Sequence, residues 1–286
     1  MKRGISAIMI LYNDGEIVRK ALESIKDIAN EILIVHDGQC KNNTLEICKE
    51  YTEKIFIREH KGCCEFHQAF LYRKSQYEWI LKIDADEYLP EDLQKNIKKL
   101  IKDKNIDGYS FLWPYWEKGV YLTKKWPRKM NLYRKSKISY LGFPNWGEPK
   151  VRGKIALSNF RLGHHHHSGD PTKWKTFINK DIKWITFLQA ENYLKKFNEF
   201  DNFQYHENEF PKYVQIRNKY PLLTSPLFSI VALLGSLASI NSKDIKVILK
   251  SAILNFVRYF YLGYYLYKLK NNKNFVPSKT SCSINH

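Results

Sequence analysis

The sequence is poor in cysteine, and none of its cysteines has the spacing of a metal or disulfide motif. The five residues stand at positions 40, 48, 63, 64 and 282, which is an odd number with no C-x-x-C pair. This pattern argues against both a disulfide framework and a thiolate zinc site. It is typical of a protein in a reducing compartment.

Acidic residues are scarce relative to basic ones. The chain has 47 Lys+Arg against 29 Asp+Glu, which leaves a formal charge of +18. A surplus of that size indicates an anionic partner, which is a nucleic acid, a phosphorylated substrate or an acidic membrane surface. No zinc-finger or RNP motif appears, so we expect no nucleic-acid partner. The N-terminal stretch MKRGISAIMILYNDG has no small-residue cleavage site after its short apolar run, and we interpret it as a first strand rather than a signal peptide.

The first hundred residues alternate between two hydrophobic periods. Four apolar runs are predicted to be strands, ISAIMIL, EILIVHD, EKIFIRE and EWILKID, and three amphipathic segments between them are predicted to be helices, GEIVRKALESIKDI, NTLEICKEYTE and CEFHQAFLYRKSQ. This order predicts right-handed crossovers and a mostly parallel sheet.

Polar residues follow three of the predicted strands. They are Asn13 and Asp14, then Asp37, then Asp84 and Asp86 in the stretch WILKIDADEYLP. Ligands bind at the carboxyl edge of an open α/β sheet, so we expect these residues to converge there. If the strand continued, Asp84 and Asp86 would point the same way and repel each other unless a cation lay between them. The alternative is a solvated acidic turn before a helix at LPEDLQ.

The pattern changes after this point. Aromatic and β-rich segments from about 108 to 162 predict an antiparallel extension that carries an acceptor pocket, with ordinary core aromatics as the alternative. Residues 173 to 200 predict a long amphipathic helix. From Tyr220 to Ser242 there is no charge, and the next segment mixes lysines with many Tyr and Phe. We interpret this region as a monotopic membrane hairpin, against a soluble hairpin packed on the rest of the chain.

Three segments, SAIMILYNDGEIVRKALESI, EILIVHDGQCKNNT and HKGCCEFHQAFLYRKSQYEWILKIDADEYL, resemble the successive signature segments of family 2 glycosyltransferases, in particular envelope-glycan enzymes. The resemblance implies an α/β fold, with a single GT-A-like Rossmann-type domain, a mostly parallel central sheet, a β-rich acceptor extension and a C-terminal helical membrane-associated region. We expect a catalytic domain over residues 1–200, with a nucleotide-binding half over 1–105 and an acceptor and metal half over 106–200. The helical region would cover 201–286.

The resemblance also implies functional residues. It assigns ten positions to nucleotide-sugar binding: Tyr12, Asn13, Asp14, Asp37, Gly38, Lys61, Gly62, His67, Asp84 and Ala85. Asp37 matches the acidic residue that hydrogen-bonds the base or ribose, and carboxylates suit such donors. At His67 and Gln68 the chain departs from the Arg-Asn that the family often has.

Asp84 and Asp86 match the metal-binding DxD motif of the family, and Mg²⁺ or Mn²⁺ prefers such oxygen ligands. The run RLGHHHHSGDPTKW supplies a late histidine to the same metal, for which His164 fits best and His166 is the alternative in a shifted register. In YLGFPNWGEPKV, Glu148 is the expected catalytic base that deprotonates the acceptor hydroxyl; Glu117 and Asp107 are weaker candidates.

Together these expectations describe a metal-dependent, inverting glycosyltransferase. Its partners would be a nucleoside-diphosphate sugar donor, with UDP favoured, a glycan or lipid-linked acceptor and an anionic membrane surface at the cytoplasmic face of the cell membrane. Two rivals remain open. One is a sugar nucleotidyltransferase, and the other is a noncatalytic basic protein that binds polyanions.

Overall fold

The computed structural model describes residues 1–113, 128–139, 149–164, 174–194, 212–239, 245–272 and 274–275, and the backbone of a short hairpin at 116–117 and 120–121. These residues form two compact units. The N-terminal unit holds the described residues up to 113, 128–139 and 149–164, and the C-terminal unit holds the hairpin and the described residues from 174 onward. The predicted boundary at residue 200 lies outside the described residues.

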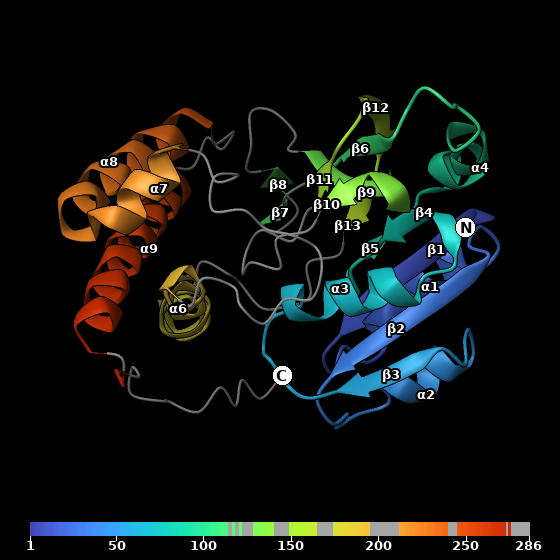
Figure 1. Cartoon of the computed structure of the whole chain (residues 1–286), viewed down its shortest axis with the longest axis horizontal. Helices are drawn as coiled ribbons and strands as arrows, with labels where there is room; N and C mark the ends of the chain where they lie inside the picture. Colours follow the sequence, from blue (N-terminus) through green and yellow to red (C-terminus); the bar gives the residue numbers. More distant parts are fainter. Residues whose placement is uncertain are drawn as a thin grey trace. The chain divides into compact units, whose positions relative to one another are not determined.

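The N-terminal unit is built on a seven-stranded sheet with the order β12-β6-β9-β4-β1-β2-β3 (Figure 1). Its strands are β1 (Lys2–Leu11), β2 (Glu31–Asp37), β3 (Ile55–Arg58), β4 (Tyr77–Lys82), β6 (Gly108–Leu112), β9 (Arg128–Arg134) and β12 (Ile155–Arg161). The helices of this unit are α1 (Ile17–Ile25), α2 (Thr44–Lys49), α3 (Glu65–Lys74) and α4 (Glu91–Leu100). All four strands and all three helices predicted for the first hundred residues are confirmed.

Helices cover both faces of the central strands, which is why those strands consist of continuous apolar runs. On one face, residues such as Ala7, Met9 and Leu81 pack in a single core cluster with Val18 and Leu22 of α1. The same cluster includes residues of α2 and α4. On the other face α3 contacts β1 and β2.

The extension from residue 108 onward differs from the prediction in one respect. β9 is antiparallel to both β4 and β6, but β12 pairs with β6 in parallel. The reason is strand order: β12 joins the sheet beside β6, and both strands run opposite to β9. The prediction of an antiparallel extension was therefore wrong for β12, and these strands complete the central sheet.

Short two-stranded ladders complete this unit. They are β5 (Glu87–Tyr88) with β13 (Gly163–His164), and β10 (Ile138–Ser139) with β11 (Lys150–Val151). The hairpin of β7 (Trp116–Glu117) and β8 (Val120–Tyr121) is grouped with the C-terminal unit. The β5–β13 ladder matters most below, because it brings a histidine to the acidic turn.

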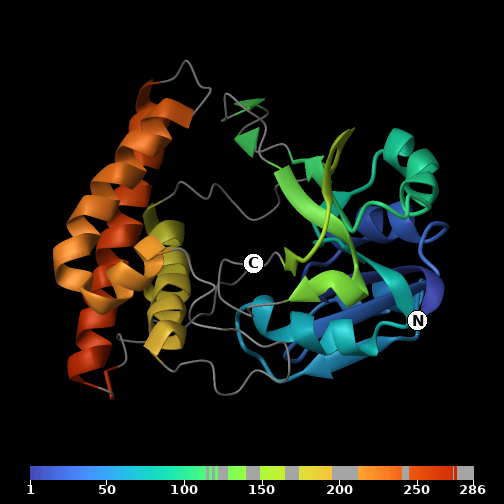
Figure 2. The same ribbon diagram turned by 45° about the horizontal axis from the view of Figure 1, so that its top comes forward.

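The C-terminal unit is helical (Figure 2). A continuous helical segment runs through α5 (Trp174–Thr176), a π-helical stretch η2 (Phe177–Thr186) and α6 (Phe187–Leu194), and is followed by α7 (Lys212–Lys219), α8 (Pro221–Ser239) and α9 (Ile245–Asn271). The predicted helix at 173–200 is thus confirmed from Trp174 to Leu194, although its π-helical part was not foreseen; residues 195–200 lie outside the described residues.

α8 and α9 lie side by side as a hairpin (Figure 1). Gly263 of α9 permits the close approach, because a Cβ at this position would lie 1.8 Å from Ser225 Oγ of α8. A neighbouring face of α9 packs against η2 and α6 through Leu262, Leu266 and Phe177, among others. α9 is therefore covered on two sides within this unit.

Candidate functional site

Three loops meet at one edge of the sheet. β4, β1 and β2 are adjacent and parallel, so the loops that follow Leu11, Asp37 and Lys82 leave the same edge. These loops contain the polar residues that the sequence places after three of its strands. The predicted convergence at the carboxyl edge is confirmed for these loops.

The loop after β1 is tied to the loop after β2. Asn13 has a left-handed backbone with φ of 55°, and its side-chain Oδ1 accepts a hydrogen bond from the Lys41 N–H at 2.7 Å. The Asn13 N–H donates to Nε2 of buried His36 at 3.1 Å, and His36 Nδ1 lies 2.8 Å from the Gly38 carbonyl. Since Nε2 accepts, Nδ1 carries the proton, and His36 is neutral. The two loops therefore form one rigid rim.

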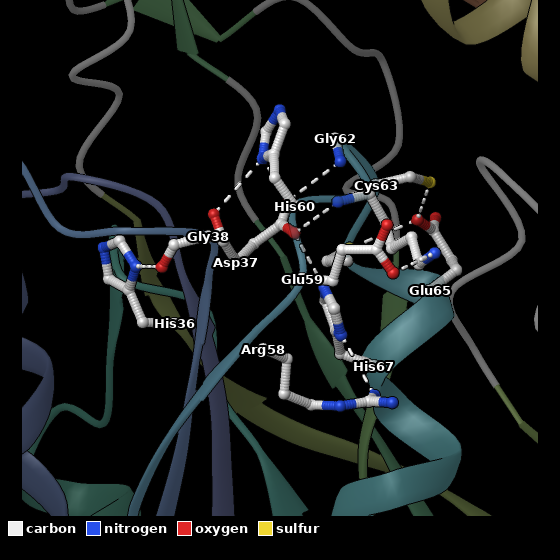
Figure 3. Close-up of polar contacts among 12 residues, drawn as sticks. His36, Asp37, Gly38, Arg58, Glu59, His60, Gly62, Cys63, Glu65 and His67 are labelled. Carbon is white, nitrogen blue, oxygen red and sulfur yellow. Dashed lines mark hydrogen bonds and ion pairs between the residues drawn. The ribbon is translucent and has the colours of Figure 1, made fainter.

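Asp37 is the centre of a hydrogen-bond cluster (Figure 3). Its Oδ1 accepts from the Lys61 N–H at 2.6 Å and lies 2.8 Å from His67 Nε2. Its Oδ2 accepts from the Gly62 N–H at 2.9 Å and lies 3.2 Å from His60 Nδ1. The hydrogen bond of His60 Nδ1 goes to the Asp37 backbone carbonyl, also at 3.2 Å, so the carboxylate accepts three hydrogen bonds at about four acceptor positions.

The histidine on α3 holds Asp37 and does not reach outward. His67 is 1% exposed, and the Arg58 guanidinium lies 3.1 Å from its Nδ1. Arg58 donates only, so Nδ1 accepts and the Nε2–H donates to Asp37. The sequence assigned His67 to nucleotide-sugar binding; in the structure both ring nitrogens contact protein groups, and His67 positions Asp37.

The cluster fixes the charge of Asp37. Burial by itself raises the pKa of this carboxyl, but the hydrogen bonds from His67 and the Lys61 N–H lower it below its usual range. Gly38 is required beside it: its φ is 92°, and a Cβ there would lie 2.9 Å from His60 Cβ. His60 in turn stacks on Tyr12, with ring centroids 4.9 Å apart.

Two adjacent thiols, those of Cys63 and Cys64, lie next to this cluster and are unreactive. Cys63 and Cys64 both donate to Glu65 Oε2, at 2.7 and 3.3 Å. Burial raises the pKa of both thiols, so they stay protonated at neutral pH. The described cysteines are all free.

The DADE segment forms a turn beyond the end of β4. The Glu87 N–H donates to the Asp84 carbonyl at 3.0 Å, and the Asp84 N–H donates to Glu87 Oε2 at 3.1 Å. Lys129 of β9 reaches into the turn, where its ammonium contacts Asp84 Oδ2 and lies 2.6 Å from Glu87 Oε1. The carboxylate crowding that the sequence showed is therefore relieved in part by a lysine.

A second buried lysine supports the turn from β4. Lys82 Nζ is 3.8 Å from Asp84 Oδ1. Although burial would raise the pKa of Asp84, Lys129 and Lys82 lower it. Burial raises the pKa of Glu87, which is 1% exposed, in spite of Lys129. For Lys129 itself, burial opposes the charge, but Asp84 and Glu87 outweigh it and raise the pKa of the ammonium.

Asp86 faces a different partner. The β5–β13 ladder pairs Glu87 with His164, which places His164 Nε2 3.4 Å from Asp86 Oδ2. The histidine is 5% exposed and its ring lies 4.8 Å from the ring of Trp113. Asp84 and Asp86 therefore do not share one contact: Asp84 is held by lysines, and Asp86 faces a histidine.

The pair of Asp86 and His164 fits a divalent metal better than Asp84 does. Across residues 1–113, 128–139, 149–164 and the described C-terminal helices, no group of three His, Cys, Asp or Glu side chains is arranged to hold a metal. Two ligands at about 2.1 Å from one metal and roughly 90–110° apart lie roughly 3.0–3.4 Å from each other, which the observed separation matches. Mg²⁺ commonly takes one or two protein ligands and completes its shell with phosphate oxygens and water.

Several predicted residues lie elsewhere. Glu148 and His166 are outside the described residues, as is the side chain of Glu117. Asp107 precedes β6, which runs in the same direction as β4, so it lies at the amino edge and away from the acidic turn. It binds Arg134 there, with Oδ1 3.5 Å from Nε.

The remaining predicted residues lie in loops at the carboxyl edge of the sheet. The Tyr12 N–H donates to Asp14 Oδ2 at 2.8 Å, and buried Ala85 occupies the acidic turn. The Lys61 ammonium extends to Glu59, at 2.8 Å, in an exposed position. These residues lie at the carboxyl edge, as expected.

Sequence reasoning missed His60, Lys82 and Lys129. His60 and Lys82 lie inside a segment that carries the family resemblance, so their position in that segment was an available signal. For Lys129 no local signal exists, because it reaches the turn through antiparallel pairing of β9 with β4, more than forty residues away in sequence.

Sequence comparisons find known proteins that are similar to this chain. A family model described as Glycosyl transferase family 2 matches residues 6–157, which is more than half of the chain and confirms the resemblance seen in the sequence. An uncharacterized glycosyltransferase of Rickettsia bellii is 30% identical over 109 residues, which is 38% of this chain and 36% of that protein. The glycosyltransferase SunS of Bacillus phage SPbeta is 29% identical over 100 residues, 34% of this chain and 24% of that one.

The matched segment spans about a third of the length of the Rickettsia relative. Among solved structures, residues 1–349 of S. aureus TarS in complex with UDP-GlcNAc align with 95% of this chain and 92% of that chain. The identity is 14% and the TM-score is 0.46. A likeness at that level is too low to transfer a ligand or a substrate.

Proposed function

Because this chain belongs to glycosyl transferase family 2, we propose that it transfers a sugar from a nucleoside-diphosphate sugar to a glycan or lipid-linked acceptor in cell-envelope glycan synthesis. The observation that carries the proposal is the meeting of Asp86 and His164, 3.4 Å apart, beside the carboxyl edge of parallel strands. Polar loops at that edge are where open α/β sheets bind nucleotides.

The favoured donor nucleotide is UDP. Its nucleoside would lie on the rim formed by the loops after β1 and β2. Tyr12 and His60 offer an aromatic pair there. The Asp37 carboxylate accepts three hydrogen bonds, so one of its roughly four acceptor positions is left for an N–H or O–H of the base or ribose. A base N–H that binds Oδ2 would lie beside the His60 ring, whose Nδ1 is 3.2 Å from Oδ2 and whose side chain is 42% exposed.

The diphosphate would bind near the acidic turn with Mg²⁺ or Mn²⁺. Asp86 and His164 would hold the metal, which when bound neutralises the leaving nucleoside diphosphate. Asp84 and Ala85 would lie beside it in the turn. Glu148 would deprotonate the acceptor hydroxyl, so that attack inverts the anomeric carbon. That assignment follows the family resemblance.

The C-terminal unit would hold the enzyme at the cytoplasmic face of the membrane. α8 is the one helix among the described residues that is long and apolar enough to cross a bilayer, and only 22% of its apolar window is buried. Its exposed residues include Leu222, Leu223, Leu227, Val231 and Leu234.

We propose that α8 lies in the interface and does not cross it. A crossing would carry its partner helix α9 into the bilayer, and Arg258 in the middle of α9 is ion-paired with Asp181 of η2 at 2.7 Å. Lysines on both ends of α9 suit an anionic headgroup layer.

Calorimetry tests the donor site. A panel of nucleoside diphosphates is titrated with and without Mn²⁺ into the wild type, Asp86→Ala and the control Asp92→Ala, which removes an exposed carboxylate of α4. Tight, base-selective, Mn²⁺-dependent binding that only Asp86→Ala abolishes supports the proposal. Weak binding that follows phosphate charge and ionic strength in all three proteins would overturn it and leave a basic polyanion binder.

A further inference from the structure

The Lys129 ammonium lies between carboxylates of the acidic turn, in the way that a bound metal cation would. Its side chain is 14% exposed, and its ammonium contacts a carboxylate oxygen of Asp84 and one of Glu87 at the same time. The strand that carries it is fixed by pairing with β4 and β6 on both sides. The contact is therefore a built feature of the sheet and not a chance surface ion pair.

The neighbouring groups hold the turn in this arrangement. The Asn131 amide donates to the Lys82 carbonyl at 2.8 Å and lies 3.4 Å from Glu87 Oε2. The Lys129 ammonium also lies 5.6 Å from the centre of the Trp113 ring, which contacts His164. One aromatic ring thus lies close to both the lysine and the histidine of this turn.

We propose that Lys129 is an internal competitor of the divalent metal, which keeps Asp84 and Glu87 out of the coordination shell. Of the described residues, Asp86 and His164 then hold the metal, and its affinity depends on the donor diphosphate. Lys129 is a positioning residue in this scheme. The inference rests on the proposed metal site. It adds a reason why Asp86 binds the metal while Asp84 and Glu87, in the same turn, bind a lysine.

The electrostatic consequence has a definite sign. A positive charge on the same turn as a metal site opposes metal binding, and at an effective dielectric of about 20 this repulsion is worth at least tenfold in affinity. Removing it also releases Asp84 as an additional oxygen ligand. Substitution of this buried lysine should therefore tighten metal binding, whereas loss of a merely supporting residue would weaken it.

The test is Mn²⁺ binding to the full chain without donor, measured by electron paramagnetic resonance of free Mn²⁺. Lys129→Met should bind Mn²⁺ about tenfold tighter than the wild type or more, and Lys129→Arg should stay within about threefold of it, since it keeps the charge. Lys95→Met is the matched control. It removes an exposed lysine that pairs with Glu91 on α4 and should change nothing.

Equal or weaker Mn²⁺ binding by folded Lys129→Met overturns the inference. If that variant does not fold because Glu87 is left buried without its lysine, Lys129→Met with Glu87→Gln removes both charges and is expected to bind more tightly too. The two proposals fail separately. If the wild type and the variants all bind no Mn²⁺ without donor, the competitor role is wrong; binding that appears only without Lys129 supports it. The metal requirement of the wild type is judged by calorimetry, where donor binding that does not depend on Mn²⁺ would refute it.

Discussion

The two units of this protein differ in which side chains they bury and which they expose. The N-terminal unit buries its apolar residues between helices and sheet and gathers buried charges, such as Asp37, Glu87 and Lys129, at one edge. The C-terminal unit leaves leucines of α8 exposed and has one described ion pair, Asp181 with Arg258. Under the proposed function, the charged edge of the first unit binds the donor, and the exposed apolar residues of the second unit contact the membrane.

The two units should therefore respond to different substitutions. We expect single substitutions of polar residues to impair the activity of the N-terminal unit. Substitutions of exposed apolar residues should weaken membrane binding by the C-terminal unit. The predictions below test this contrast, from the largest expected effect to the smallest.

Glu148→Gln should lower the turnover number by about 10² to 10⁴, because a general base contributes that much to the rate. Donor binding should be unchanged, since the residue is proposed to act on the acceptor. Steady-state kinetics with a matched donor-binding measurement check both points. A loss of donor affinity instead of turnover would contradict the assignment of the base.

Leu223→Asp combined with Leu227→Asp should weaken binding to vesicles that contain anionic lipid by about a hundredfold. Each side chain is more than half exposed on α8, and burying a leucine in lipid is worth about 1.5–3 kcal/mol. Co-sedimentation with vesicles gives the partition constant. The control is Leu157→Asp, an equally exposed leucine on β12 of the N-terminal unit, which should bind like the wild type. Equal losses in both proteins would remove the contrast between the units.

Arg258→Met should destabilise the C-terminal unit by about 1–3 kcal/mol, below the cost of breaking a fully buried pair, because both side chains are partly exposed. The cause is Asp181 left without its guanidinium. Adding Asp181→Leu should recover part of the loss, which urea unfolding followed by circular dichroism would show. If the double variant is as unstable as the sum of the single variants, the pair is not coupled.

Asp37→Asn should flatten the pH dependence of stability in acid. The pKa of Asp37 is lowered in the folded protein, so its contribution is present above the unfolded pKa of about 4 and is lost as the pH falls through the folded pKa. Urea unfolding from pH 5 downward should show a smaller decline for the variant than for the wild type. Asp92→Asn is the exposed control. Parallel curves for wild type and Asp37→Asn would show that the cluster does not set this charge.

Much of the fold was predictable from local pattern. The alternation of strands and helices up to Leu100 follows from periodicity, because each segment must bury one face or both. The convergence of Asn13, Asp37 and Asp84 follows from the parallel order of their strands, and the family match confirms the resemblance that the motifs carried.

The sequence by itself thus determined the strands, the helices and the edge at which the polar loops meet, since these depend on neighbours in the chain. Only the tertiary structure decided how the charges of that edge are paired. Lys129 reaches Asp84 through β9, and His164 reaches Asp86 through the β5–β13 ladder. Such pairings depend on contacts between distant segments, and no local period of apolar residues encodes which lysine or histidine will face a given carboxylate.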